Sequence, residues 1–577
     1  MIKKGGDKRM MKKTMLKKAA AAVLCTAMVV SLAACGGGSG TKETAAAGSS
    51  AAGSEAGSTG EAAGEKEAFE INVHNGSEPA SLDPNALNSN DSMITTLHMF
   101  EGLAKYAKGG EGVELGQAKD YTVSDDGLVY TFTLRDDIFW SDGQPVVAGD
   151  FVYSWQRLVS GGYENSYFID MVQNAVEIQN GSKDKSELGV KAIDDKTLEV
   201  TLKAPCNYFI EIVAAAVTSP VRQDVIEANG EMWYENPETY IGNGAYKLVE
   251  WSHQEKIVME ANDKYYDYAN LGPTKITWML MDDDNAILAA FESGDLAYAS
   301  SFPTEELDRL KEAGTFQVAP VAGTYYILVN AEGKGMIPEL QDPKVRRALA
   351  LAIDRNYVTD MVTKRGELPA DTFLPRGFHD EDGKDYYDSA DKFWDNFTYE
   401  ANCEEAKKLM AEAGYPDGAG FPTISYTINN NSAHAAIAEY VQNVWKEVLG
   451  VDCTIDSQEF AVFLDMRSAG DYALARAGWT VDYMDPASLM ELWITSSGNN
   501  DCHFYNEEYD SYISAAAHAT SQNERFENFH KAEKILEEQL PIIPIYYYSE
   551  PYLMDTSKYD GFFSYLAMPV FKYVVQK

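Results

Sequence analysis

Several segments of the chain alternate apolar and polar residues in the way that a half-buried β-strand does. The clearest is 128–134, in which every second residue is large and apolar and an Asp126-Gly127 turn comes just before. The alternation returns in 198–202 after another acidic turn, and 70–74 also has a strand-like pattern. We therefore expect strands at these three places and antiparallel pairs in the first half of the chain.

The second half of the chain changes to the period of amphipathic helices. Asp342-Pro343 can cap and open a helix whose apolar residues fall on one face as far as Ala352. Two further helices are expected at about 403–413 and 433–449, each followed directly by a glycine. Strand-like segments come after them, so the pattern predicts a mixed α/β fold.

The first 34 residues have the features of an export signal peptide (1–34). Lysines and arginines precede a short apolar run that is too short and too weakly apolar to span a bilayer comfortably. Its end, LAACG around Cys35, resembles the bacterial lipobox, in which the cysteine is acylated and becomes the mature N-terminus; the alternative is an alanine-rich signal with a chance cysteine. Residues 35–68 would then be a lipidated Cys35 and a disordered tether, because this stretch has no aromatic residue.

Length and charge restrict the classes of protein that need consideration. At 577 residues the chain is longer than one hydrophobic core supports, so we expect two or three domains that can close a cleft. The net charge of -41, with no basic stripe beyond the N-terminus, argues against nucleic-acid binding. No HExxH, GxSxG or P-loop motif is present, so we expect no enzymatic activity, no cofactor and no metal site.

The cysteines leave one question open. Cys206, Cys403, Cys453 and Cys502 are widely spaced and form no CxxC pair. Export permits disulfides, but four cysteines have three possible pairings and the sequence does not choose among them.

One segment is unusual because of its charges. Arg476 lies within an apolar, strand-like run, nine residues after Arg467, and the acids Asp482 and Asp485 follow. A charge in such a run needs a partner. One interpretation is an internal arginine–carboxylate pair, with Asp485-Pro486 capping a helix; the other is a binding site for a charged ligand.

This segment, RAGWTVDYMDP followed by SSGNN, closely resembles the signature of periplasmic oligopeptide-binding proteins of the OppA type, family 5 of the solute-binding proteins. Further matches follow in order along the chain and together span essentially all of residues 69–577. They are NGSE with SLDP (75–84), FWSDG (139–143), DFVYSWQRL (150–158), GVKA (189–192), NGAYKL (243–248), VRRAL (345–349) and PIYYY (544–548).

The resemblance implies an extended peptide enclosed between two lobes, with its main chain hydrogen-bonded as an added strand. The family's aspartate for the peptide α-ammonium falls on Asp482. The groups that the family offers to peptide carboxylates match Arg467, Arg476 and His434.

Aromatic and glycine contacts carry over as well. Tyr167 and Trp479 correspond to aromatic ligand contacts, Gly478 permits close backbone approach, and Tyr547 is a further candidate. For Tyr167 and Tyr547, packing in the core is an equally weighted alternative. Thr480 stands where well-known relatives have cysteine, which argues against copying their disulfide, and Phe460 replaces a frequent Trp in a side-chain pocket.

The resemblance also implies a three-domain, two-lobed periplasmic-binding-protein-like architecture with a hinge. A discontinuous lobe I would comprise 69–102, 227–330 and 550–577, domain II would comprise 103–226, and lobe III would comprise 331–549.

The expected function is extracytoplasmic capture of oligopeptides and delivery to an ABC permease and ATPase complex, by a monomer lipid-anchored at the outer face of the cytoplasmic membrane. Alternatives within the family are binding of dipeptides, nickel chelates or haem. Alternatives from other classes are a secreted hydrolase and a peptide-sensing or adhesion lipoprotein without a transporter.

Overall fold

A computed structural model describes residues 69–87, 89–380, 382–519 and 521–577. The expected signal peptide, Cys35 and the tether up to residue 68 lie outside these residues. Across the described ranges, no helix is both long enough and apolar enough to cross a membrane. The described residues belong to one compact unit.

A mixed sheet is the largest element of the described residues and has eleven strands. Its order is β15 (Cys453–Gln458), β14 (Ile424–Asn429), β16 (Leu474–Thr480), β12 (Phe316–Val329), β17 (Ile542–Met554), β11 (Tyr298–Ala299), β1 (Glu70–His74), β10 (Lys275–Met279), β9 (Lys256–Ala261) and β8 (Tyr246–Ser252), and β13 (Leu368–Pro369) pairs with β17.

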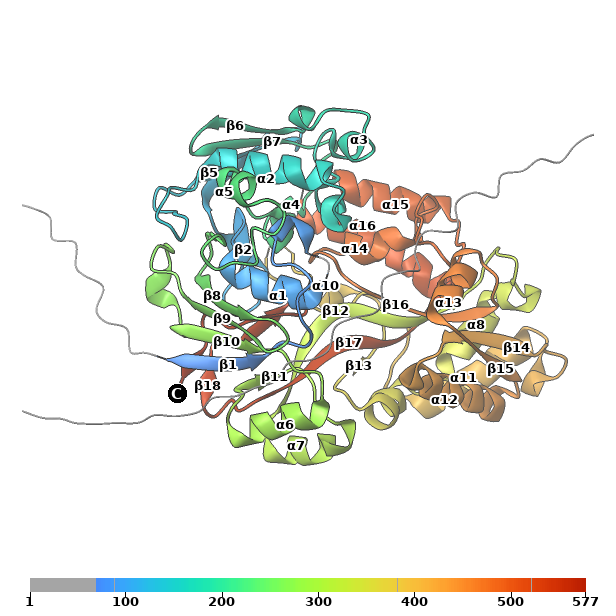
Figure 1. Cartoon of the computed structure of the whole chain (residues 1–577). Coiled ribbons are helices and arrows are strands. Elements are labelled where there is room, and N and C mark those ends of the chain that lie inside the picture. Colours follow the sequence, from blue (N-terminus) through green and yellow to red (C-terminus); the bar gives the residue numbers. More distant parts are fainter. Residues whose placement is uncertain (1–68, 88, 381, 520) are drawn as a thin grey trace, which may run out of the picture. The chain divides into compact units, whose positions relative to one another are not determined.

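The two longest strands of this sheet, β12 and β17, run antiparallel through its middle (Figure 1). The first part of β12, up to Pro320, pairs with the end of β17 from Ser549 onward. The second part, from Thr324, pairs with the beginning of β17. The register shifts between Pro320 and Thr324, so the pairing of β12 with β17 is irregular between these two parts.

Three predicted strands are confirmed. Strand β1 has the predicted bounds, and β5 (Val129–Leu134) and β7 (Thr197–Thr201) lie side by side in a separate antiparallel sheet of order β4 (Ala118–Val123), β5, β7, β6 (Val190–Asp194). Burial along β5 alternates as expected, with Tyr130, Phe132 and Leu134 inside.

Three short two-stranded sheets complete the β-structure: β2 (Ala104–Tyr106) with β3 (Val113–Leu115), β18 (Tyr559–Asp560) with β21 (Val575–Gln576), and β19 (Phe563–Tyr565) with β20 (Met568–Val570).

The predicted helices of the second half are also confirmed. Helix α8 (Pro343–Leu351) begins where the Asp342 side chain accepts a hydrogen bond from the Lys344 amide. Helix α12 (Ser432–Leu449) ends at Gly450, which adopts the left-handed conformation that suits a C-cap. Helix α11 (Tyr399–Glu412) begins earlier than the predicted start at about residue 403.

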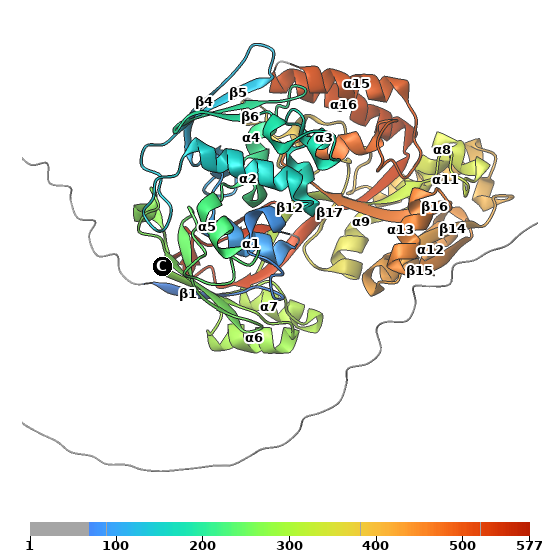
Figure 2. The same cartoon turned by 45° about the horizontal axis from the view of Figure 1, so that its top comes forward.

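The remaining α-helices are short or lie outside the sheet, and α15 packs along α16 (Figure 2). They are α1 (Asn90–Met99), α2 (Ala148–Ser160), α3 (Ala175–Gln179), α4 (Phe209–Ile212), α5 (Gln223–Asn229), α6 (Asp284–Ser293), α7 (Leu307–Ala313), α9 (Arg355–Tyr357), α10 (Tyr386–Ser389), α13 (Phe460–Ser468), α14 (Ala487–Met490), α15 (Glu507–His518) and α16 (Gln522–Gln539).

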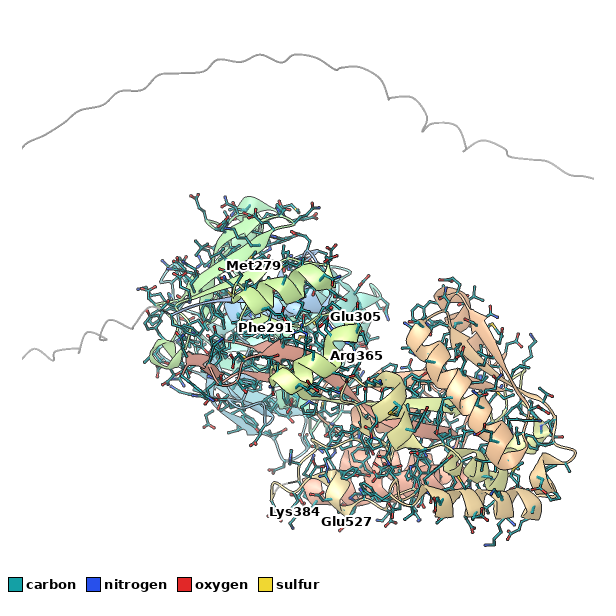
Figure 3. The ribbon with its side chains drawn as sticks, turned by 90° about the horizontal axis from the view of Figure 1, so that it is seen from below. Met279, Phe291, Glu305, Arg365, Lys384 and Glu527 are labelled. Carbon is teal, nitrogen blue, oxygen red and sulfur yellow. The ribbon has the colours of Figure 1, made fainter. Side chains whose placement is uncertain are left out.

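The apolar side chains form separate cores. One core lies within residues 322–546, and a second combines residues 71–298 with a few side chains near the C-terminus. A smaller third core packs α6 and α7, with Met279 and Phe291 at its edge (Figure 3). The predicted α/β class is confirmed, whereas the predicted domain boundaries stay a prediction.

Candidate functional site

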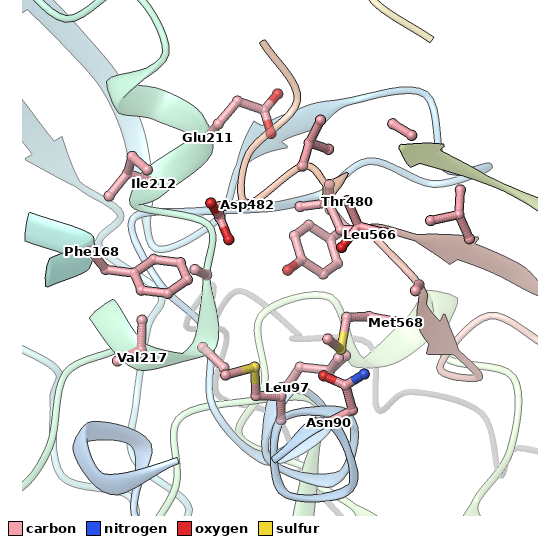
Figure 4. A pocket seen from close by; sticks show the side chains of 18 of the residues that line it. Asn90, Leu97, Phe168, Glu211, Ile212, Val217, Thr480, Asp482, Leu566 and Met568 are labelled. Atoms are coloured by element: carbon pink, nitrogen blue, oxygen red, sulfur yellow. The ribbon is translucent and has the colours of Figure 1, made fainter. Parts of the chain in front are cut away.

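A pocket of about 340 Å³ brings together residues that lie far apart in the sequence. Its walls include parts of α1 and α4, residues 167–168, residues 215–217, part of β12, the end of β16 with the loop after it, and the turn between β19 and β20 (Figure 4). Two of the expected site residues, Asp482 and Tyr167, line it. Most other lining side chains are aliphatic.

The loop after β16 holds Asp482 in this pocket through contacts that do not use its carboxylate. The Asp482 amide donates to the Ser488 hydroxyl at 3.0 Å. Asp485 accepts from the Ala487 amide at 2.9 Å and pairs with Arg525, so the loop is fastened on the far side of Asp482. The Asp482 carboxylate has no hydrogen-bond or ion-pair partner among the described residues. It is solvent-exposed, but the surrounding protein desolvates it enough to raise its pKa.

Tyr167 faces the same pocket from the opposite part of the chain. It lies in the 3₁₀ segment Glu164–Ile169 and is 48% exposed. Desolvation, and secondarily the charge of Asp482, raise the pKa of Tyr167 to about 12. The side chain therefore stays a neutral hydroxyl that can donate a hydrogen bond at physiological pH.

A second group of expected residues gathers around Arg476 on β16. Its Nε donates to the Asn429 side chain at 2.7 Å, and its guanidinium lies 5.0 Å from the Phe463 ring. The His434 ring stacks 5.6 Å from the buried Tyr325 ring. Burial, and secondarily the positive charge of Arg476, lower the pKa of His434 to about 4. Arg476 has no carboxylate within ion-pair distance anywhere in the described ranges, so its charge is available to an anionic group.

Arg467 is placed differently. Its Nε donates to the Asp501 carboxylate at 2.6 Å, and both side chains are mostly buried. The internal arginine–carboxylate pair that the sequence offered as one interpretation concerned Arg476 in its apolar run, and the structure forms such a pair at Arg467 instead. The Arg467 guanidinium lies 5.7 Å from the ring of Phe463, the same ring that contacts Arg476.

Gly478 and Trp479 lie on opposite faces of β16. A Cβ added at Gly478 would come within 2.0 Å of the Tyr548 hydroxyl, so a side chain there is excluded unless Tyr548 moves. Trp479 packs against the larger core, and its indole nitrogen is buried without a hydrogen-bond partner in the described structure. Neither residue lines the pocket of Asp482.

Tyr547 lies in the interior. It is 6% exposed, and its hydroxyl is 2.7 Å from the Thr372 hydroxyl and also bonds to the backbone of Asp371 and Thr372. The next residue, Tyr548, contacts Gly478, and burial raises its pKa to about 12. Sequence reasoning missed Tyr548. Because side chains alternate along β17, Tyr547 lies on one face of the strand and Tyr546 and Tyr548 lie on the other, but the sequence does not show which face contacts a ligand.

Glu211 is a further pocket residue that sequence reasoning missed. It follows two apolar residues in the short helix α4, and nothing in that pattern distinguishes it from a surface acid. Cys206, Cys403, Cys453 and Cys502 are all free and buried. In the part of the chain that the structure describes, no three His, Cys, Asp or Glu side chains form a group that could hold a metal ion.

Comparison with known proteins assigns the fold. The family model for bacterial extracellular solute-binding proteins, family 5 (middle region), matches residues 112–501. The oligopeptide-binding protein OppA of Bacillus subtilis is 34% identical over 511 residues, which is 86% of this chain and 91% of the relative.

Three solved structures of two kinds of relative, MppA and OppA, also resemble this chain. The unliganded open form of the murein tripeptide-binding protein MppA gives a TM-score of 0.79 at 32% identity, covering 89% of this chain and 98% of that chain. A second MppA structure, from Escherichia coli, gives only 0.65 at the same identity, covering 89% and 99%. Haemophilus influenzae OppA in complex with the peptide RPPGFSPFR gives 0.64 at 30% identity, again covering 89% and 99%.

Of these three structures, the unliganded open form of MppA gives the highest TM-score. The chain belongs to the bacterial extracellular solute-binding proteins of family 5, which are binding proteins that act outside the cytoplasm.

Proposed function

We propose that this protein binds oligopeptides outside the cytoplasm and delivers them to an ABC transporter for uptake. The relatives named for oligopeptide binding, and the peptide bound in the Haemophilus influenzae structure, support this substrate class. The observation that carries the proposal is Asp482, whose unpartnered carboxylate faces a pocket across from Tyr167.

Asp482 binds the peptide α-ammonium. A carboxylate held in a desolvated pocket without a partner gains a charge-assisted hydrogen bond when an ammonium enters. When the lobes close over this pair, removing one partner costs about 2 to 5 kcal/mol, and each 1.4 kcal/mol is a factor of about ten in affinity. Blocking the amino group of the peptide therefore weakens binding strongly.

Arg476 and His434 receive the peptide carboxylate or other acceptor groups of the ligand. Arg476 has the forked donors that suit a carboxylate, and one of them is already oriented by Asn429. Arg467 takes part for peptides of another length, in exchange for its bond to Asp501. Gly478 lets the peptide main chain approach β16, Trp479 contributes apolar contact, and the role of Tyr547 stays a prediction.

Binding closes the two lobes. The likeness to an open, unliganded relative and the irregular pairing of β12 with β17 support a hinge at these strands. A ligand stabilises the closed form only through contacts that are better when closed. Asp482 and Tyr167 come from opposite parts of the chain and provide such contacts.

We also propose lipid attachment at Cys35, with residues 36–68 as a tether and residues 1–34 as the signal peptide. The protein then acts as a monomer anchored at the outer face of the cytoplasmic membrane. Two acyl chains hold a protein at a bilayer where one barely does.

Isothermal titration calorimetry tests the proposal with peptides of three to eight residues, each with a free and with an acetylated amino terminus. Free peptides should bind at least about thirtyfold more tightly than acetylated ones. The Asp482→Asn variant should lose this difference. Asp308→Asn is the matched control, because Asp308 is an exposed helical aspartate without a side-chain partner in the described structure.

Equal affinity for free and acetylated peptides rejects the role of Asp482. The family alternatives are separated by the same instrument, since titration with dipeptides, a nickel chelate or haem would then give the tight binding that oligopeptides lack. A hydrolase would cleave the bound peptide, so recovery of intact peptide by mass spectrometry excludes that alternative.

A further inference from the structure

The pocket of Asp482 contains two acidic side chains, and one peptide amino terminus can balance the charge of only one of them when both are ionised. Glu211 and Asp482 both line it, and none of its lining residues is Lys, Arg or His (Figure 4). The α-ammonium of a peptide supplies a single positive charge. Glu211 is then left facing the ligand without a counter-charge, unless the ligand brings a second one.

Glu211 has a carboxylate oxygen free for a ligand. Its Oε2 accepts a hydrogen bond from the Tyr565 hydroxyl at 2.8 Å. Its Oε1 has no hydrogen-bond partner among the described residues, and the side chain is only half-buried. The residue is thus held in position by one oxygen and can receive a cation with the other.

The groups that face Glu211 are neutral or acidic. Tyr565 donates to it, Tyr106 lies close enough to be affected by its charge, and Asp482 shares its pocket. Burial raises the pKa of Glu211 to about 7, and the charge of Asp485 adds to this. A positively charged ligand group would favour the ionised form of Glu211.

A recess adjoins the pocket of Asp482 and contains a buried polar group without a partner. It has a volume of about 180 Å³ and shares Asn90 and Ala567 with the pocket. Asn75 lines it, is 2% exposed, and has no side-chain hydrogen-bond partner in the described ranges. A buried amide without partners is costly unless a ligand or water satisfies it. No Lys or Arg lines this recess either.

We propose that Glu211 is a specificity-determining residue that selects peptides whose first residue is lysine or arginine. The α-ammonium binds Asp482, and the side-chain cation of the same residue binds the free oxygen of Glu211. This inference rests on the proposed peptide-binding function. The apolar walls at Ile212 and Val217 suit the methylene stem of a long basic side chain.

The test compares two pentapeptides that differ by one charge. One begins with lysine and the other with norleucine, which has an unbranched apolar side chain in place of the lysine ammonium, and both continue with four alanines. Calorimetry on the purified full-length chain at pH 8, where Glu211 is ionised, should give about tenfold tighter binding of the lysine peptide. Moving the lysine to the fourth position should abolish this advantage.

Two variants assign the effect to a residue. Glu211→Gln should bind both peptides with the affinity that the wild type shows for the norleucine peptide. Glu550→Gln is the matched control, because Glu550 is also half-buried, also accepts from one hydroxyl, that of Ser564, and lines the adjoining recess rather than the pocket. It should keep the lysine preference, and thermal unfolding should show that both variants are folded.

Each outcome has a definite meaning. If the wild type binds the lysine and norleucine peptides equally, or if Glu211→Gln keeps the preference, the role of Glu211 is overturned. If Glu550→Gln removes the preference instead, the recess is the selective site and the assignment to Glu211 is wrong. Binding of the norleucine peptide that is lost on N-acetylation preserves the role of Asp482 in all these cases, whereas no binding of any peptide overturns the proposed function itself.

Discussion

The ion pair between Asp485 and Arg525 gives the sharpest stability prediction. Asp485 is 3% and Arg525 is 2% exposed, and both terminal guanidinium nitrogens of Arg525 donate to the Asp485 carboxylate. Asp485 also accepts from the amide of Ala487, the first residue of α14, although the N-cap of this helix is Pro486 and makes no side-chain cap hydrogen bond. The pair fastens the loop that carries Asp482 to helix α16.

Replacing Arg525 by leucine leaves the Asp485 charge buried and unpaired. Removing one partner of a buried pair typically costs about 3 to 5 kcal/mol, because the desolvation penalty of the other remains. The Arg376–Asp388 pair is the comparison, since its side chains are 53% and 63% exposed. Exposed pairs are worth about 0 to 1 kcal/mol.

Urea unfolding followed by circular dichroism measures these differences. Arg525→Leu should lower the free energy of unfolding by about 3 to 5 kcal/mol, and Asp388→Ala should lower it by no more than about 1 kcal/mol. The double variant Asp485→Leu with Arg525→Leu should be more stable than Arg525→Leu alone, because no unpaired charge remains. The reasoning is refuted if Arg525→Leu costs as little as Asp388→Ala, or if the double variant is the least stable of the three.

Three further predictions follow from the site. Gly478→Ala should destabilise the protein by about 1 to 3 kcal/mol, since the new Cβ would lie 2.0 Å from the Tyr548 hydroxyl. Adding Tyr548→Phe to this variant should restore part of the melting temperature. An unchanged melting temperature in Gly478→Ala would contradict the contact. Arg476→Met should raise the pKa of His434 from about 4, though burial keeps it below the ordinary value, and an NMR titration that shows no rise would contradict their proximity. The preference for a lysine peptide should grow from pH 6 to pH 8, because Glu211, with a pKa of about 7, is mostly protonated at the lower pH and ionised at the higher; a flat calorimetric profile would count against it.

The sequence pattern predicted strands and helix ends correctly where they depend on neighbouring residues. The strand at 70–74 and the Asp342 cap of α8 depend on neighbouring residues, and both were read correctly from the sequence. Burial in β5 follows its alternation for the same reason.

Partners that are distant in the sequence could not be predicted. The sequence left open whether the arginine in the apolar run pairs internally, and only the fold brings Asp501 to Arg467 and Arg525 to Asp485. The three consecutive tyrosines 546–548 show the same limit, since β12, which pairs with β17, and β16, which pairs with the other edge of β12, determine which ring reaches the site. Glu211 could not be found locally, because its helix meets the loop after β16 only in the folded chain.

A crystal structure of the protein with a bound peptide tests the central claim most directly. The account predicts that the peptide amino nitrogen lies about 3 Å from the Asp482 carboxylate, with Tyr167 closed over it. A ligand whose amino group binds elsewhere, or a non-peptidic ligand in this pocket, would contradict it.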